Sequence, residues 1–235
     1  MTRFLALACA FLALGLTAIS SPASAITMVL KYTGTVTDST YIGGDHFGLT
    51  PGGSLDGAAV KVHVRYDTAL GERMTVPGVT DQLFGGGSFG TADPIRSFLI
   101  TINGYSEQMA DPYYGFAMAA PSELGQSASS YGGTRAATTS ALSSGGAAFV
   151  PDLEAALPIT TLVGPLQGIG HFGMVDCFLP NCGPHNDYLI ADMSFDTIEI
   201  APVPLPASLG AILAALCALG AAGLRHQASA AARRG

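Results

Sequence analysis

The segment that decides the fold is AAVKVHVRYD, residues 58–67. Its apolar and polar residues alternate, with Val60, Val62, Val64 and Tyr66 set between Lys61, His63, Arg65 and Asp67. Successive side chains of a β-strand point to opposite faces, so this pattern predicts a strand with one buried and one solvated face. Such a strand is typical of an antiparallel sheet with one side in water, where His63 is expected on the wet side.

Other segments repeat this pattern. Two of them have three apolar residues in strand phase: Met28, Leu30 and Tyr32 in ITMVLKYTGTV, and Phe98, Ile100 and Ile102 in IRSFLITING. The Asn103-Gly104 pair that ends the second segment predicts a hairpin turn. Shorter strands are predicted in YYGFAMA, ITTLVG and GIGHFGMVD, at residues 113–119, 159–164 and 168–176.

The last strand candidate, DYLIADMSFDTIEIA, changes phase within itself. Near Asp196 the apolar residues move to the other face: Leu189, Ala191, Met193 and Phe195 share one phase, Ile198 and Ile200 the other. The change predicts a bulge, or a strand that passes from one sheet to another. Many short strands without an amphipathic helical pattern favour an all-β fold, an antiparallel, jelly-roll-like β-sandwich.

Two segments lack a clear strand pattern. Residues 43–57, GGDHFGLTPGGSLDG, are predicted to form a loop because Gly, Pro and Asp dominate them. Residues 121–147 are rich in Ser, Ala and Gly and are expected to form a short helix or a mobile insertion.

Composition limits the partners. The chain has 235 residues, of which 30 are Gly and 14 Pro, and only 11% are charged, which suits one domain with processing segments at its ends. The predicted domain, residues 26–201, has six basic residues against all 17 acidic residues, a net charge of −11. Nucleic acid is therefore not an expected partner.

The first 25 residues, MTRFLALACAFLALGLTAISSPASA, predict a signal peptide. Arg3 precedes an apolar run over residues 4–19, and Ala23-Ser24-Ala25 matches a small-residue cleavage site, so cleavage is expected after Ala25. The alternatives are a lipoprotein signal that uses Cys9 and an uncleaved anchor.

The other end carries a predicted transmembrane helix over residues 207–224. This uncharged run of 18 residues would cover about 27 Å of a ~30 Å hydrocarbon layer. Arg225, Arg233 and Arg234 follow it, so the positive-inside rule predicts a cytoplasmic tail and an outward-facing body. The alternative is a helical hairpin buried in the core.

The domain contains two cysteines, Cys177 and Cys182, in DCFLPNCGPH. In an oxidising compartment such a close pair, with Pro and Asn between, predicts a disulfide that closes a small loop. The alternative is a zinc site completed by His171 and His185, although the spacing matches no common zinc pattern.

No residue is assigned to catalysis, to a metal or to a cofactor, and no cofactor is expected. GGGSFG, residues 85–90, fits both a nucleophile-elbow and a dinucleotide-loop pattern, but Pro94 and a strand follow where either motif needs a helix. It is interpreted as a glycine hinge or loop, and Ser88 as non-catalytic.

Two further groups have a binding interpretation beside a plainer one. The first would converge on a cation or stay as solvated carboxylates: His171, Asp176, His185, Asp187 and Asp192. The second is Tyr113-Tyr114, an adjacent aromatic pair of which a strand would expose at most one to a sugar.

The C-terminal segment resembles the PEP-CTERM class of sorting signals in its VPLPA form. The motif is Val203, Pro204, Leu205, Pro206 and Ala207. A membrane helix and a basic end follow, although the basic cluster is split by QASAAA, and Leu205 stands where the better-known form has Glu. The prolines lack N–H donors and keep the motif extended.

This resemblance implies export across the inner membrane of a Gram-negative bacterium. It also implies recognition by an exosortase-type membrane enzyme and delivery to the cell surface or an extracellular polysaccharide matrix. The expected function is that of an exported surface or matrix protein without catalytic activity. One alternative is a carbohydrate- or Ca²⁺-binding module of the matrix, which an exposed aromatic row would favour; another is a secreted hydrolase, which a deep pocket joining Asp, His or Ser88 would favour.

Overall fold

The computed structural model describes residues 26–42, 46–50, 52–87, 89–110, 112–130, 135–175 and 188–203. Contacts divide the chain into two units, Met1–Pro202 and Val203–Gly235. Apart from Val203, the described residues belong to the first unit, and they are called the body below. They form strands, turns and loops and no helix.

The strands of the body are long at its two ends and shorter between them. They are β1 (Thr27–Ile42), β2 (Ala59–Asp67), β3 (Glu72–Val76), β4 (Thr80–Gly86), β5 (Ile95–Ile102), β6 (Tyr105–Ala110), β7 (Tyr114–Ala120), β8 (Glu123–Ser129), β9 (Arg135–Ser143), β10 (Leu157–Thr161), β11 (Leu166–Val175) and β12 (Tyr188–Pro202).

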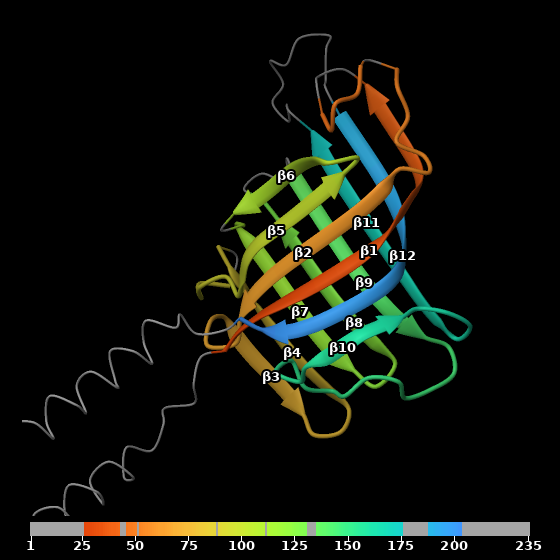
Figure 1. The fold of residues 1–235 in the computed structure, drawn as a ribbon. Helices are drawn as coiled ribbons and strands as arrows, with labels where there is room; N and C mark the ends of the chain where they lie inside the picture. The colour runs from red at the N-terminus through yellow and green to blue at the C-terminus, as the bar shows by residue number, and fades with distance from the viewer. Residues whose placement is uncertain are drawn as a thin grey trace, which may run out of the picture. The chain divides into compact units, whose positions relative to one another are not determined.

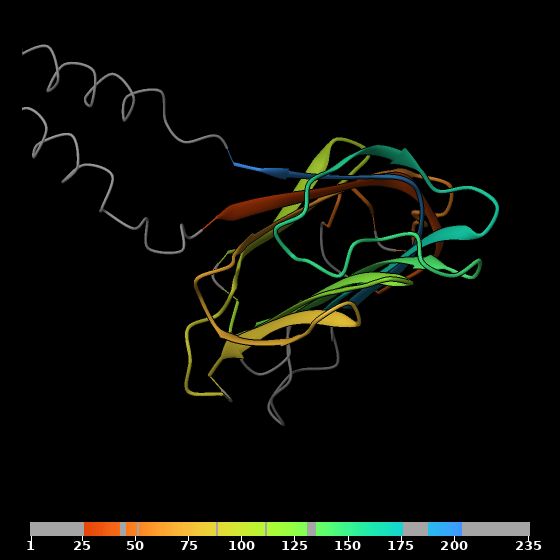
Figure 2. The ribbon, with the colours of Figure 1, turned by 90° about the horizontal axis from the view of Figure 1, so that it is seen from below.

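All these strands join one antiparallel sheet, which confirms the predicted all-β antiparallel class. The hydrogen-bonded order is β3-β4-β7-β8-β9-β11-β12-β1-β2-β5-β6, and β10 pairs with β12 beside this path. The sheet curls, so that β1, β2, β5 and β12 lie in front of β7, β8 and β9 (Figure 1). Seen from below, the half with β1 and β12 faces the half with β4 and β7 across the interior (Figure 2).

The curled sheet differs from the finer prediction of a jelly-roll-like sandwich. A sandwich has two separate sheets, whereas here one ladder runs unbroken from β3 to β6. Facing halves still give the core two layers. On the open side β5 approaches β7 without pairing, where Gly115 leaves room for the side chain of Ile95.

The alternation in residues 58–67 is confirmed in β2. Val60, Val62, Val64 and Tyr66 are at most 1% exposed. The inward positions predicted for β1 and β5 are also buried: Met28, Leu30, Tyr32, Phe98, Ile100 and Ile102. Burial of a large apolar side chain stabilises a protein by roughly 1.5–3 kcal/mol, so the inward faces of β1, β2 and β5 contribute most to the stability of the core.

The β5–β6 hairpin is also confirmed. Asn103 and Gly104 form its turn with positive φ angles of 51° and 85°. Two positive angles are the signature of a type I′ turn, whose twist matches that of the flanking strands.

The phase change near Asp196 is confirmed as a bulge in β12. Against β1, Thr33 pairs with Thr197 and Gly34 pairs with Phe195, so Asp196 is left out of the ladder. The other neighbour of β12 changes at the same point: β11 pairs up to Phe195, and β10 takes over from Thr197. The bulge is therefore the point at which the central strand moves between two neighbours.

The expectation of a helix or mobile insertion over residues 121–147 is wrong. This segment contains β8 and β9, which pair with each other from Glu123–Leu142 to Ser129–Ala136. Small residues such as Ala128, Ala137 and Ala141 fill its inward positions. They alternate as in any strand, but they lack the large apolar side chains by which a strand is recognised in a sequence.

A buried polar cluster connects the two halves of the sheet. The Tyr32 hydroxyl of β1 donates to Gln126 Oε1 of β8 at 2.9 Å, and Thr139 Oγ1 of β9 donates to the same oxygen at 3.1 Å. Burial raises the pKa of Tyr32, against a smaller lowering effect of Thr139, so the hydroxyl stays protonated. The cluster fixes which part of β8 lies above β1.

We expect Gly34→Ala to destabilise the body by about 3 kcal/mol, because the added Cβ would overlap the Ser194 carbonyl oxygen and the Phe195 backbone. Gly125→Ala is the matched control, since its nearest atoms are at 3.5 Å, an ordinary contact distance. Urea unfolding of both variants measures the difference. Equal stability of the two variants would contradict the close approach of β1 and β12.

Candidate functional site

Most of the site residues predicted from the sequence lie outside the described residues. These are the cleavage site at Ala25, the cysteines Cys177 and Cys182, and the motif from Pro204 onward. The disulfide and the cleavage therefore stay predictions. Val203 alone represents the sorting motif, directly after the end of β12.

The same limit applies to the membrane and metal predictions. No helix among the described residues is long and apolar enough to span a membrane, and the predicted span over residues 207–224 is outside them. Within the described part of the chain no three His, Cys, Asp or Glu side chains form a metal-binding group. Asp176, His185 and Asp187 are not described.

The structure does bring together two of the proposed cation ligands. His171 of β11 and Asp192 of β12 are direct partners in the ladder. His171 Nδ1 lies 2.8 Å from Asp192 Oδ1, with the side chains 48% and 55% exposed. An exposed pair of this kind orients the imidazole ring and adds little to stability.

The His171–Asp192 pair borders a shallow groove, which bears on the hydrolase alternative. The groove has a volume of about 350 Å³ and includes the hydroxyl residues Thr138 and Ser140. Among the described residues, however, no hydroxyl hydrogen-bonds to His171. A triad needs such a bond to activate its nucleophile, and the described residues provide only the oriented histidine.

The clearest surface feature is an aromatic group on the outer face of β4 and β7. We call Phe84, Phe89, Tyr114 and Phe116 the aromatic surface. Phe84 and Phe116 are direct partners in the ladder, on the face opposite the buried Leu83 and Ala117.

Phe89, in the turn after β4, contacts two of the other rings. Its ring centroid lies 5.1 Å from that of Phe84 and 5.6 Å from that of Tyr114. It remains 44% exposed. Phe84, Phe89 and Tyr114 thus form a connected set of rings, and Phe116 lies next to Phe84 in the ladder.

The sequence prediction reached one edge of this surface. Tyr113, just before β7, is 39% exposed with its ring against Gly87, whereas Tyr114 is only partly exposed. Phe84 and Phe89 were missed because β4 was not predicted, and Phe116, within the predicted strand YYGFAMA, had no predicted neighbour on its outer face. The β4 sequence TDQLFGG has Leu83 and Phe84 side by side, which conceals the alternation.

The most buried charge in the described body has a structural role. Asp81 on β4 is 1% exposed and receives hydrogen bonds from Arg73 Nε and Nη2 at 2.9 and 2.6 Å. Thr75 and the backbone N–H of Leu153 also donate to it. Arg73 continues to Glu154 at 2.8 Å. The cluster fastens the segment before β10 to the β3–β4 hairpin.

Burial by itself would raise the pKa of Asp81. The hydrogen bonds from Arg73, Leu153 and Thr75 outweigh that effect and hold the pKa below its usual value. The carboxylate is thus ionised at neutral pH, as a bidentate hydrogen-bonded pair with arginine requires.

No protein-family model matches the chain, and no curated protein or solved structure shows significant similarity to it.

We expect Asp81→Asn to lower the free energy of unfolding at pH 7 by about 2–3 kcal/mol, somewhat less than for a fully enclosed pair because the Arg73 side chain is 35% exposed. The pKa of Asp81 is lower in the folded protein than in the unfolded chain. The stabilisation that the ionised Asp81 carboxylate provides is therefore complete above the unfolded pKa of about 3.9. It is lost as the pH falls through the folded pKa.

Urea unfolding at pH 7 and at pH 3 tests this prediction. Asp192→Asn, at an exposed carboxylate, serves as the control and should change stability by less than about 0.5 kcal/mol. A loss for Asp81→Asn that is equally large at both pH values would argue against the charged pair.

Proposed function

We propose that this chain is an exported cell-surface or extracellular-matrix protein without catalytic activity, delivered by its VPLPA-type C-terminal signal. The observation that carries the proposal is the agreement between the ends of the fold and the predicted processing segments. β1 begins at Thr27, two residues after the predicted cleavage at Ala25, and β12 ends at Pro202, directly before the motif. The described strands thus lie between the two predicted processing segments.

The pairing of the two terminal strands supports the same proposal. Met28 pairs with Pro202, so the first residues of β1 and the last residues of β12 lie side by side. Pro204 and Pro206 have no N–H to extend the ladder beyond Pro202. A membrane enzyme of the exosortase type would meet an extended motif beside a folded domain, and the helix over residues 207–224 would hold it at the membrane.

Intact-mass analysis of membrane, surface and medium fractions tests delivery in a host that carries an exosortase-type enzyme. We expect a mature chain that begins at Ile26 and has lost the residues beyond the motif. A variant with both Pro204→Ala and Pro206→Ala should keep its tail and stay in the membrane, whereas Ser208→Ala should be processed normally. Full-length chains in every fraction, for all three proteins, would refute the proposal.

A second candidate function is carbohydrate binding, which the aromatic surface favours. Flat aromatic rings offer large apolar areas with little loss of conformational freedom. Phe89 is the most exposed of the four rings, and it contacts both Phe84 and Tyr114. This arrangement suits the apolar faces of neutral sugar rings in a matrix polysaccharide.

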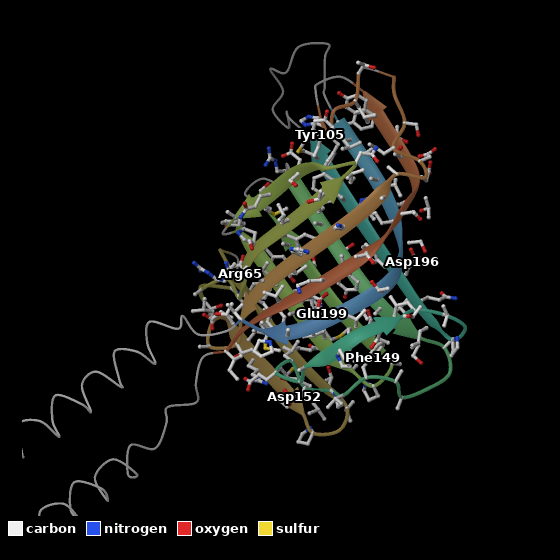
Figure 3. All side chains as sticks on the ribbon, viewed as in Figure 1. Arg65, Tyr105, Phe149, Asp152, Asp196 and Glu199 are labelled. Carbon is white, nitrogen blue, oxygen red and sulfur yellow. The ribbon has the colours of Figure 1, made fainter. Side chains whose placement is uncertain are left out.

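We expect Phe89→Ala to weaken binding to a neutral polysaccharide by about tenfold, the loss typical of a central aromatic contact. Affinity electrophoresis of the full chain in gels with dextran, β-glucan or xylan measures this. Tyr105→Ala is the control, because Tyr105 (labelled in Figure 3) is an exposed ring, at 57%, on β6, a strand that does not carry the aromatic surface. Equal retardation of both variants, or no retardation of the wild type by any of the three gels, would eliminate this candidate.

A further inference from the structure

The basic residues of the body gather on one face. Four of the six between residues 26 and 201 lie on the outer side of three adjacent strands: Lys31 of β1, Lys61 and Arg65 of β2, and Arg96 of β5. Together with His63 we call them the basic surface. Lys61, Arg65 and Arg96 are exposed, between the buried positions of their strands. In a domain with 17 acidic residues, this grouping is a local reversal of charge.

The ladder sets the spacing of these side chains. Lys31 is opposite His63, and Arg65 is opposite Ser97, the residue after Arg96. Lys61 and Arg65 are four residues apart on one strand, which corresponds to about 13 Å. The positive charges therefore extend along the outer face of the sheet instead of meeting at one point.

A groove at one end of this face adds neutral hydrogen-bonding groups. It has a volume of about 360 Å³, and its lining includes Arg65, Arg96, Thr27, Ser97 and Gln108. Guanidinium groups bind carboxylates through paired N–H donors, and hydroxyl and amide groups bind sugar hydroxyls. The groove thus offers donors for both parts of an acidic sugar.

Among the described residues, Glu199 and Asp67 share the face and partly reduce its charge. Glu199 accepts a hydrogen bond from Lys31 Nζ at 2.9 Å (Glu199 and Arg65 are labelled in Figure 3). Asp67 lines the groove, and its Oδ1 accepts the Ala69 N–H at 3.0 Å. Among the described residues no carboxylate forms an ion pair with Lys61 or Arg65. The positive charge is therefore concentrated along β2.

The pKa of His63 reflects this field. Burial lowers it most, and the charges of Lys31 and Lys61 lower it further, against a smaller raising effect of Glu199. His63 is therefore neutral at pH 7, and the charge of the basic surface at that pH comes from lysine and arginine.

We propose that the basic surface binds an acidic polysaccharide, with Arg65 and Arg96 holding sugar carboxylates in the groove and Lys61 extending the contact along β2. This deepens the proposed matrix role by naming the charge of the polymer, and it rests on that role. The rest of the body is strongly acidic and repels polyanions, which confines the contact to this face. An acidic sugar polymer fits better than a nucleic acid, because the density of phosphates on DNA would meet the net charge of −11 at close range.

Affinity electrophoresis and titration of the full chain with polygalacturonate, at 50 and 300 mM NaCl, test the proposal. We expect binding to weaken by about tenfold at the higher salt. The Arg65→Gln/Arg96→Gln double variant should lose about tenfold in affinity at low salt, and Lys61→Gln alone about threefold. Arg135→Gln is the matched control, an arginine on β9 outside the basic surface, and should bind within about twofold of the wild type.

Thermal unfolding of each variant shows whether it is folded. Lys61→Gln provides an independent result if the double variant is unstable.

Three outcomes would each overturn the proposal: binding of neutral dextran as tightly as polygalacturonate, unchanged binding of both basic-surface variants, or tighter binding of duplex DNA. Phe89→Ala separates the two sugar candidates, since it should leave polygalacturonate binding intact. Processing of the tail with no polygalacturonate binding would reject this inference alone, whereas binding without processing would reject delivery alone.

Discussion

The whole sheet depends on the pairing of β1 with β12, the first and last strands of the body. Their ladder runs from Met28–Pro202 to Ile42–Tyr188, in the middle of the strand order. Formation of the β1–β12 ladder brings together residues separated by most of the body's sequence. During folding, the entropy cost of closing this long loop therefore has to be met before the contacts of the ladder can offset it. The body therefore cannot complete its core until β12 is available.

The parts of the fold that were predictable are those with local signals. The alternation around Val62 and Val64, the Asn103-Gly104 turn and the phase change at Asp196 all come from side chains close in sequence. The β8–β9 hairpin was missed because its buried face consists of small residues, whose alternation has little contrast in hydrophobicity. The single curled ladder was also not predictable, since neighbours such as β4 and β7 are set by long-range register.

The same distinction separates the candidate sites. The pair His171 and Asp192 was recognised as a group of suitable residue types, and a ladder register then placed the two side chains in contact. The aromatic surface needed β4 beside β7, and its central ring, Phe89, comes from a glycine-rich turn that has no aromatic pattern of its own. The basic residues on β2 were visible in the sequence, but Arg96 and Lys31 join them only through the neighbours of β2.

The two proposed sugar-binding surfaces lie on different halves of the curled sheet. The aromatic surface is on the outer side of β4 and β7, and the basic surface is on the outer side of β2 and its neighbours. These halves face each other across the core, so their outer sides point away from one another (Figure 2). One polymer segment would not contact both surfaces without bending around the body. A molecule that uses both surfaces would connect two polysaccharide chains. It would then strengthen a matrix by cross-linking, and its overall binding to the matrix would be tighter than the binding of either surface alone.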